Sequence, residues 1–466
     1  MDKVEIWDTT LREGEQQRDV HFTLDQKIEI ADALLNRFKV AVNVEIHCYR
    51  HTFEEAKAMV DRFGKERVIL HHRLLESDLD VSKGCGKKAR AGMFLGTSNS
   101  HLKSLNLTKK DALEKLERTL EYAYQCGLKV GKLTFEDAPG TDIDFLRDLC
   151  RVVNKSRVEV LTICPAQSVE RFRPEVYSKL MKKIMEFTDI PLLTHCHNDR
   201  GLSVAACLAA YDVGVRRFNT SVLGLGERAG ITPMEQLLLN FKLEGIDVDT
   251  TGIWEICDLV KRYTGVSLAP HTPVIGGNVY AHKAGAHVRK VMVDPSTYEA
   301  CPPETVGRKG RVILISHLSG TSSILEKLRN DYGINISEEE ARDIAEKVRE
   351  YGMKWRGDVS TYDFEEMVAE RLGIKAEELI ASRRFPQEVY GIFFINVDPE
   401  HRDEVGRSIR RDIREATSIC EIMGSDIDLK VEVTTTSLER LEEYRRAIEG
   451  LSGVKNVKNY IIVKKY

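Results

Sequence analysis

The sequence predicts an α/β protein: a (β/α)8 TIM barrel, then helical subdomains, then a C-terminal ferredoxin-like β-α-β-β-α-β domain. Three observations lead to this prediction. Eight short β-rich runs occur in about the first 250 residues, helical stretches separate them, and a second pattern of strands and helices starts at Val389. Strands that alternate with helices indicate a parallel sheet. Eight such units in about 250 residues match the usual size of a TIM barrel.

The eight predicted strands are rich in apolar and β-branched residues. They cover residues 3–10, 40–47, 67–73, 90–96, 129–137, 158–164, 191–197 and 216–226. Between them, stretches such as LDQKIEIADALLNRF and DALEKLERTLEYAYQCG place apolar residues at helical spacing. A doubly wound open sheet is the structural alternative. Its GxGxxG fingerprint is absent, because the first strand leads into DTTLREGEQ.

The rest of the chain changes its pattern twice. Residues 252–380 are helical and irregular, and from Val389 the order becomes β-α-β-β-α-β, which is the ferredoxin-like arrangement. We therefore expect a TIM-barrel domain, helical linker subdomains and a C-terminal domain. Their expected bounds are 1–250, 251–380 and 388–466, with ASRRFPQ (381–387) as the linker before the last domain.

Composition excludes several classes of protein. The 69 basic and 73 acidic residues give a net charge of −4, so no overall field attracts the chain to nucleic acid or to an anionic membrane. No apolar run approaches the length of a membrane span, and the first residues, MDKVEIWDTT, lack a signal-peptide core. Ten cysteines without a CxxC pair are typical of free thiols in a reducing compartment, which predicts a cytoplasmic protein.

THCHNDRG (194–201) raises the question of a metal site. The preceding run is a predicted strand, in which residues i and i+2 share a face, so His195 and His197 lie side by side near its end. In a TIM barrel, functional residues gather on the rim where the strands end. The polar residues at predicted strand ends are Asp8, Arg12, Glu13, Glu45, His47, His71, Arg73, Thr97, Ser98, Lys132, Thr134, Glu136, Asp137, His195, His197, Glu227 and Arg228. Their convergence favours a metal site over two ordinary polar histidines.

Six motifs resemble those of the isopropylmalate, homocitrate and citramalate synthases, which share a TIM barrel with lyases of the hydroxymethylglutaryl-CoA type. In order, over about residues 3–330, they are DTTLREGEQ, FEDAPGTD, THCHNDRG, GLGERAGITP, HKAGAH and YEACPPETVGR. Within the family, REGEQ, LGLGERAGITP, HKAGAH and PPETVGR are most similar to homocitrate synthases. The resemblance implies a condensation of acetyl-CoA with a 2-oxo acid, in the first place 2-oxoglutarate to homocitrate, with release of CoA.

The resemblance also implies a divalent metal ion. Two imidazoles and one carboxylate leave open positions at which an oxo acid can chelate the metal. The implied ligands are Glu13, His195 and His197, with Asp8 as a fourth candidate. Zinc, manganese and magnesium all remain open as the metal.

Other residues of the motifs take roles around that metal by the same resemblance. Arg12 stabilises the developing oxyanion, and Glu136 acts on protons or water near the thioester. His282 and His287 are alternative bases or acids, with Tyr298 downstream. In the family this segment crosses into the neighbouring subunit, which implies a homodimer with shared active sites. The implied substrate contacts are Gln16, His71, Arg73, Lys132, Thr134, Ser168 and Thr194, of which His71 and Arg73 meet a distal carboxylate.

Three departures from the family pattern bear on the oxo acid. EIHCYR (45–50) replaces EAG-P, QSVE (167–170) replaces DTVG and puts Ser168 in place of threonine, and Lys132 replaces arginine. These departures leave open a citrate synthase of Re type that uses oxaloacetate. Pyruvate and 2-oxoisovalerate, the substrates of citramalate and isopropylmalate synthases, fit less well with a second carboxylate contact. A lyase of hydroxymethylglutaryl-CoA type is another alternative.

The C-terminal segment resembles the small-molecule-binding domain of Lrp/AsnC regulators. The resemblance implies an amino-acid effector, lysine if the product is homocitrate, and a regulatory domain of this kind argues against the lyase. MGSDIDLKV (423–431), with Gly424 and Asp426 in a turn, is the expected contact segment. Alternatively the domain only dimerises the protein. A DNA-binding regulator is not expected, because no helix-turn-helix precedes residue 389.

Overall fold

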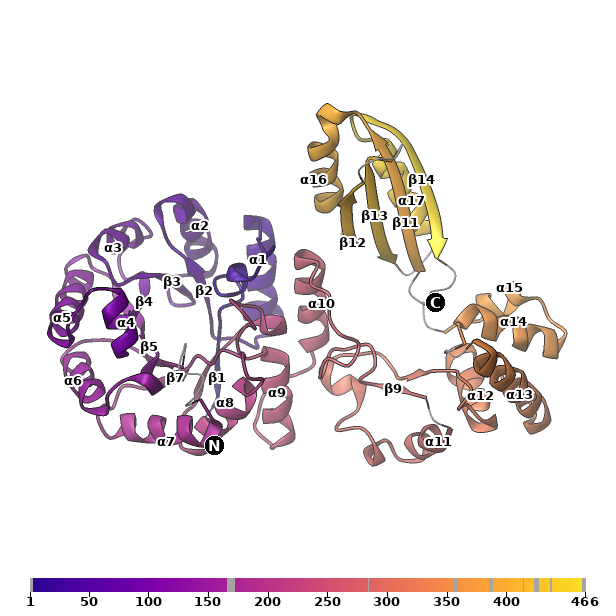
Figure 1. Ribbon diagram of the computed structural model, residues 1–466, viewed down its shortest axis with the longest axis horizontal. Coiled ribbons are helices and arrows are strands. Elements are labelled where there is room, and N and C mark those ends of the chain that lie inside the picture. Colours follow the sequence, from indigo (N-terminus) through magenta and orange to yellow (C-terminus); the bar gives the residue numbers. More distant parts are fainter. Residues whose placement is uncertain are drawn as a thin grey trace. The chain divides into compact units, whose positions relative to one another are not determined.

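The computed structural model describes residues 3–165, 172–283, 285–355, 359–384, 389–413, 415–422, 427–435 and 438–462. The chain divides into two compact units, Met1–Thr264 and Gly265–Tyr466 (Figure 1). Among the described residues, no helix is both long and apolar enough to cross a membrane.

The first unit is a closed barrel of eight parallel strands (Figure 1). The strands follow chain order around the barrel, and β1 pairs with β8 to close it. The strands are β1 Glu5–Asp8, β2 Asn43–His47, β3 Val68–Arg73, β4 Arg90–Gly96, β5 Lys129–Glu136, β6 Leu161–Cys164, β7 Leu192–Thr194 and β8 Arg217–Thr220. Each lies within its predicted range. The TIM-barrel prediction is confirmed, and the open doubly wound sheet is excluded because β1 and β8 leave no open edge.

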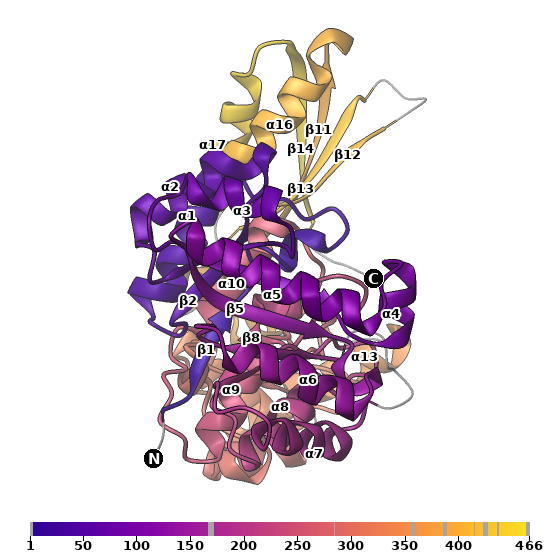
Figure 2. The ribbon, with the colours of Figure 1, turned by 90° about the vertical axis from the view of Figure 1, so that its left-hand side faces the viewer.

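Helices surround the strands, and α5, α6 and α7 follow one another across the face shown in Figure 2. The helices of this unit are α1 Leu24–Asp32, α2 Phe53–Phe63, α3 Glu76–Lys83, α4 Asn99–Ser104, α5 Lys109–Gln125, α6 Ile143–Asn154, α7 Pro174–Met185, α8 Ser203–Asp212, α9 Met234–Leu243 and α10 Ile253–Thr264. Local sequence signals fix where two of these helices begin, because Thr23 and Thr108 form capping boxes at the starts of α1 and α5. The buried side of α6 has the helical spacing of an amphipathic helix: Phe145, Leu146, Leu149, Cys150 and Val153.

The interior of the barrel is layered. Its apolar layer is the buried cluster Trp7, Ile69, Val160 and Leu193. Two residues further along β3 is His71, and two residues beyond Leu193 is His195; strand alternation keeps each pair on one face. The polar layer therefore lies toward the carboxyl ends of the strands, where TIM barrels carry their active sites.

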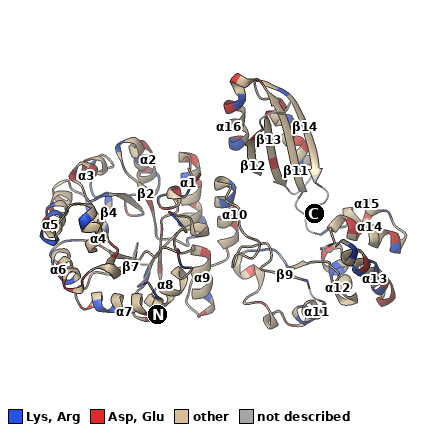
Figure 3. Cartoon of the chain, in the orientation of Figure 1, with Lys and Arg blue, Asp and Glu red and all other residues tan. Residues whose placement is uncertain are grey.

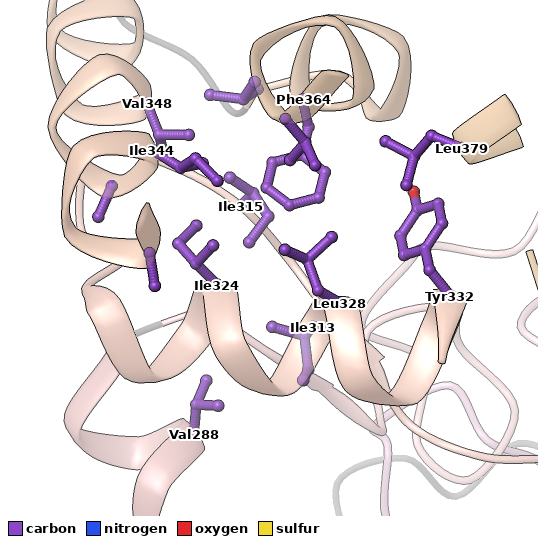
Figure 4. Packing of buried hydrophobic residues seen from close by; sticks show 14 residues of the cluster. Val288, Ile313, Ile315, Ile324, Leu328, Tyr332, Ile344, Val348, Phe364 and Leu379 are labelled. Carbon is purple, nitrogen blue, oxygen red and sulfur yellow. The ribbon is translucent and has the colours of Figure 1, made fainter. Parts of the chain in front are cut away.

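The second unit begins with a helical region. Its elements are β9 Ala281–His282, α11 Gly285–Val293, β10 Val312–Ile313, α12 Thr321–Lys327, α13 Glu338–Trp355, α14 Thr361–Leu372 and α15 Ala376–Ala381. β9 and β10 form a two-stranded parallel sheet. Ile324 of α12 and Leu328 just after it pack with Ile344 of α13 and Phe364 of α14, as Figure 4 shows. Close by, the Tyr332 hydroxyl donates a hydrogen bond to the buried carboxylate of Glu365 (2.8 Å).

A four-stranded antiparallel sheet with two helices ends the described chain. Its elements are β11 Val389–Val397, α16 Arg402–Asp412, β12 Ala416–Glu421, β13 Leu429–Thr435, α17 Leu438–Glu449 and β14 Val454–Ile462. The strand order is β12-β13-β11-β14. Phe393 and Val431 of the sheet share one core with Val405 of α16 and Leu441 of α17. Alternate residues of β13 are buried, so one face of the sheet carries this core.

Candidate active site

One carboxylate, that of Glu45 on β2, joins several side chains inside the barrel. Glu45 is 2% exposed. It accepts hydrogen bonds from Lys132 Nζ on β5 (2.9 and 3.0 Å) and from Arg12 Nε and Nη2 (3.2 and 3.0 Å). Thr9 Oγ1 donates to it at 2.7 Å, and His71 Nδ1 lies 3.1 Å away. Burial raises the pKa of Glu45, but the charges of Lys132 and Arg12 outweigh burial and hold that pKa well below its ordinary value.

Glu13 lies between Arg12 and His195. Arg12 Nη1 donates a hydrogen bond to Glu13 Oε2, and the same oxygen is 3.8 Å from His195 Nε2. Burial raises the pKa of Glu13, whereas Arg12 and the histidines lower it, and the net result is a pKa of about 2. The backbone N–H of Glu227 also donates to Glu13 Oε1 (3.4 Å). Glu13 is therefore an ionised, oriented carboxylate near the histidines of β7.

The loop GLGERAG after β8 requires glycine at one position. Gly230 has a φ of +76°, and a Cβ there would lie 1.8 Å from the Gly224 carbonyl oxygen. The close approach lets the N–H of Ile231 donate to that oxygen (3.1 Å), while the Gly230 carbonyl accepts from Asn198 N (2.9 Å). This turn presents the Glu227 N–H to Glu13, and it links the loop to the histidine segment.

His195 and His197 lie side by side, with ring centroids 5.2 Å apart. His195 Nδ1 donates to Asn219 Oδ1 (2.5 Å), and Asn219 is itself oriented because its Nδ2 donates to the Trp7 carbonyl (2.6 Å). The remaining nitrogen, Nε2, then carries the lone pair that a metal needs. Burial lowers the pKa of His195 to about 3, so the imidazole is neutral at physiological pH.

Three side chains near the ends of neighbouring strands form a possible metal site. The Sγ of Cys164 and a ring nitrogen each of His195 and His197 all lie within 4.8 Å of one another, and all three residues are buried. Glu13 is adjacent but turned to Arg12. Asp8, the fourth candidate ligand, is directed into its own loop, because its carboxylate accepts hydrogen bonds from Thr10 N and Oγ1 (2.9 Å each). Burial raises the pKa of Asp8 to about 7 and also raises the pKa of the Cys164 thiol.

The donor set fits a divalent metal. The imidazoles are neutral, an ionised carboxylate is near, and among the described residues His197 Nδ1 is buried without a hydrogen-bond partner. Nitrogen, oxygen and sulfur donors of this kind suit zinc and related ions.

Glu136 at the end of β5 is paired with a histidine. His101 Nε2 on α4 lies 3.7 Å from Glu136 Oε2, and His101 Nδ1 is 2.8 Å from Ser98 Oγ. Burial raises the pKa of Glu136. Arg228, another polar residue at a predicted strand end, binds Asp199 with two hydrogen bonds (2.9 and 3.0 Å).

The residues expected to contact the oxo acid lie in different environments, some inside the barrel and one largely exposed. His71 and Lys132 face the interior and bind Glu45. Thr134 lies two residues beyond Lys132 on β5, buried and with its hydroxyl unpartnered among the described residues. The side chain of Arg73 is 57% exposed and makes two hydrogen bonds to Asp78 (2.9 Å each).

Two of the expected contacts do not point into the barrel in this structure. Thr194 faces outward, where its hydroxyl is 3.4 Å from Cys207 Sγ on α8, because strand alternation puts it opposite His195. Gln16 is exposed, and its neighbour Gln17 accepts a hydrogen bond from Gly226 N (3.3 Å). Ser168 lies outside the described residues.

The second unit contains His282 and His287 of HKAGAH and, downstream, Tyr298. These three residues form two groups. His287 and Tyr298 lie together, with ring centroids 4.4 Å apart, and Tyr298 is 46% exposed. His282 Nε2 instead lies 2.9 Å from Glu299 Oε1, and Glu299 also binds Arg311.

Sequence reasoning missed several neighbours of these groups. Glu45 was noted only as a strand end, while Asn219, Cys164 and His101 were not noted as site residues. Strand alternation and strand order are the sequence signals that indicate Glu45 and Cys164. Glu45 lies two residues before His47 on the same strand face, and Cys164 ends the strand next to the one that carries the histidines.

Comparisons with known proteins identify the family of this chain. Residues 3–260 match the HMGL-like family, and residues 274–355 match the homocitrate synthase post-HMGL domain-like family. Homocitrate synthase of Sulfolobus acidocaldarius is 32% identical over 99% of this chain and 98% of that protein. Homocitrate synthase of Saccharolobus solfataricus is 30% identical over the full length of both chains. A Methanopyrus kandleri protein named "Probable 2-isopropylmalate synthase" is 30% identical over 97% of this chain and 93% of that protein.

The solved structure of the HMG-CoA lyase of Bacillus subtilis has the same barrel fold, with a TM-score of 0.50 and 17% identity over 57% of this chain and 96% of that chain. The barrel, the residues at its mouth and these matches place the chain in the HMGL-like family. Within it, the two homocitrate synthases named above match this chain over almost their whole length.

We predict that Glu45→Gln lowers the free energy of unfolding by about 3–5 kcal/mol, because it leaves Lys132 buried without its carboxylate partner. Urea unfolding followed by circular dichroism measures the loss. Because the folded pKa of Glu45 is below its ordinary value of 4.5, this stabilisation is present above about pH 4.5 and is lost as the pH falls toward the folded pKa.

The matched control is Glu5→Gln, which breaks the partly exposed pair with Arg217 and costs about 0–1 kcal/mol. The double variant Glu45→Gln/Lys132→Met should lose less than the sum of the single variants. Equal, small losses at Glu45 and Glu5 would contradict a central role for Glu45.

Proposed function

We propose that this protein is an acyltransferase that condenses acetyl-CoA with a 2-oxo dicarboxylic acid and releases CoA, with 2-oxoglutarate as the substrate and homocitrate as the product. The observation that carries the proposal is the grouping of Arg12, Glu13, His195 and His197 at the barrel mouth. Its support is the similarity to two homocitrate synthases over the whole chain. The free thiols support a cytoplasmic site for this reaction.

His195, His197 and Glu13 hold the divalent metal in this proposal. When bound, the metal polarises the 2-oxo oxygen of the substrate and stabilises the alkoxide that forms from it. Arg12 adds a fixed positive charge beside the same oxygen. Glu45 supports both functions, because it holds the Arg12 guanidinium in place through two hydrogen bonds. Asn219 fixes the ring of His195.

Glu136 and His101 transfer protons near the thioester of acetyl-CoA in this proposal. Burial raises the pKa of Glu136, which suits a carboxyl group that exchanges a proton, and His101 is close enough to orient it. His287 and Tyr298 lie together in the second unit, and we propose that they, with His282, reach the barrel of a partner subunit in a homodimer. Of the two histidines, His287 is the proposed acid or base, because His282 is already paired with Glu299.

Metal dependence is the first test of this function. His195→Ala and His197→Ala should each abolish CoA release and deplete bound metal, because each removes one of two imidazole ligands. Elemental analysis and a thiol assay of released CoA make the two measurements. The matched control is His72→Ala, since His72 is buried on β3 and contacts the Arg73 carbonyl rather than the site. Full turnover in a thoroughly chelated sample would refute the metal role.

The second test concerns the oxo acid. We propose that Arg73 exchanges Asp78 for the distal carboxylate of the substrate, with His71, Lys132 and Thr134 lining the pocket. Ser168, which lies outside the described residues, stays a substrate contact proposed from the sequence alone. Arg73→Ala should then raise the KM for 2-oxoglutarate about tenfold, which corresponds to about 1.4 kcal/mol, with little change for pyruvate. Asp78→Asn is the control, because it removes the partner of Arg73 and keeps the guanidinium. An equal rise for both oxo acids would remove Arg73 from substrate selection.

The C-terminal part is the regulatory element in this proposal. We propose three functional parts, 1–250, 251–380 and 388–466, of which the last is a ferredoxin-like module of Lrp/AsnC type that binds an amino acid. The support is its strand order, β12-β13-β11-β14, with one helix after β11 and one after β13. The contact segment proposed around Gly424 and Asp426 lies outside the described residues.

A chain that ends at Arg384 tests this regulation. It should keep synthase activity and lose inhibition by the pathway's amino acid, most specifically lysine, because the ligand-binding module is gone. Full-length enzyme assayed with a panel of amino acids is the reference. If no amino acid inhibits the full-length enzyme, the module is structural and the regulatory proposal is wrong.

A further inference from the structure

The register of β6 and β7 places Cys164 beside His195. Ile163 of β6 is the partner of Thr194 of β7, so the next residues along the two strands, Cys164 and His195, are also neighbours. Thr194 faces outward to α8, and alternation therefore turns Cys164 and His195 to the interior. Cys164 is 3% exposed.

The thiol and the two imidazoles converge. Their ligand atoms lie within 4.8 Å of one another, which one bound ion can bridge after small side-chain adjustments. Asn219 occupies Nδ1 of His195 and leaves Nε2 for the ion. The buried Nδ1 of His197 has no hydrogen-bond partner among the described residues. Each of the three side chains thus has an unused donor atom at the same place.

We propose that Cys164 is itself a ligand of the metal, together with His195 and His197, and that its sulfur makes zinc the preferred ion. The inference deepens the proposed function and rests on the metal site assumed there. Thiolate sulfur is a soft ligand that suits zinc, whereas magnesium and manganese favour oxygen ligands. On binding, the thiol S–H bond breaks, its proton passes to solvent, and the sulfur lone pair forms the bond to the ion.

Glu13 fits beside this set. Its carboxylate is held by Arg12 at 3.8 Å from His195 Nε2, so it fits as the fourth ligand beside Cys164 and the two histidines. Glu13, Cys164, His195 and His197 would then hold the ion, which would polarise the oxo acid.

Cobalt substitution tests the proposal without any assay of activity. The full-length protein is stripped of metal by chelation and loaded with one equivalent of Co²⁺, and its absorption spectrum is recorded. Thiolate bound to Co²⁺ gives an intense near-ultraviolet charge-transfer band, whereas nitrogen and oxygen ligands alone give only weak visible bands. We expect the charge-transfer band in the native chain and its loss in Cys164→Ser, with the visible bands of bound Co²⁺ retained.

Cys150→Ser is the matched control, because Cys150 is equally buried but lies on α6 outside the barrel. It should keep the band. Bound Co²⁺ without a charge-transfer band in the native chain, or a band that survives Cys164→Ser, would overturn the role of Cys164 and leave the histidine site standing. The native spectrum decides this even if Cys164→Ser fails to fold. If one equivalent of Co²⁺ does not bind the native chain at all, the metal site of the proposed function fails with it.

Competition between metals tests the selectivity. Cys164→Ser should weaken Zn²⁺ binding at least about tenfold, and Mg²⁺ or Mn²⁺ binding much less, because only zinc gains from the sulfur. Titration of the apo-protein with each ion measures the three affinities. Equal losses for all three ions would refute zinc selection by sulfur.

Discussion

Inside the barrel of this protein, two cations and an imidazole stand where water is largely excluded, and one carboxylate binds all three. Glu45 accepts hydrogen bonds from Lys132 and Arg12 and contacts His71. An unpaired charge in such a place is strongly unfavourable, so these side chains hold one another in position. Through Arg12 the cluster extends to Glu13, and through Lys132 to Asn219, which orients His195. The stability of the barrel and the geometry of its mouth therefore depend on the same ion cluster.

The polar layer of the barrel interior both stabilises the barrel and positions the side chains at its mouth. Below it, Trp7 and Leu193 belong to an apolar cluster. Above it, the histidines and Glu13 face the mouth, with the glycine turn at Gly230 close enough to fix Glu13 through the Glu227 N–H. His195, the proposed metal ligand at the mouth, is thus supported by hydrogen bonds that begin in the middle of the barrel. Over the helices drawn in Figure 3, lysine and arginine are interspersed with aspartate and glutamate.

Much of this could be predicted from the sequence, and the limits have a physical cause. Strand and helix periods are local, so all eight barrel strands were located, and the spacing of His195 and His197 put them on one face. Contacts between strands are not local. The pairing of Glu45 with Lys132, the approach of Cys164 to His195 and the hydrogen bonds of Arg73 to Asp78 depend on register and rotamer, which the sequence does not state. The same alternation that pairs the histidines turns Thr194 outward to Cys207.

We propose that the ion cluster and the histidine site at the barrel mouth serve the condensation of acetyl-CoA with a 2-oxo dicarboxylic acid. CoA release by the metal-loaded, full-length protein tests this function, with acetyl-CoA and each of 2-oxoglutarate, oxaloacetate, 2-oxoisovalerate and pyruvate, and with the products identified by mass spectrometry. We expect the highest kcat/KM with 2-oxoglutarate and the mass of homocitrate as the product. A clear preference for 2-oxoisovalerate or pyruvate, or cleavage of a hydroxyacyl-CoA in place of condensation, would refute the proposed function.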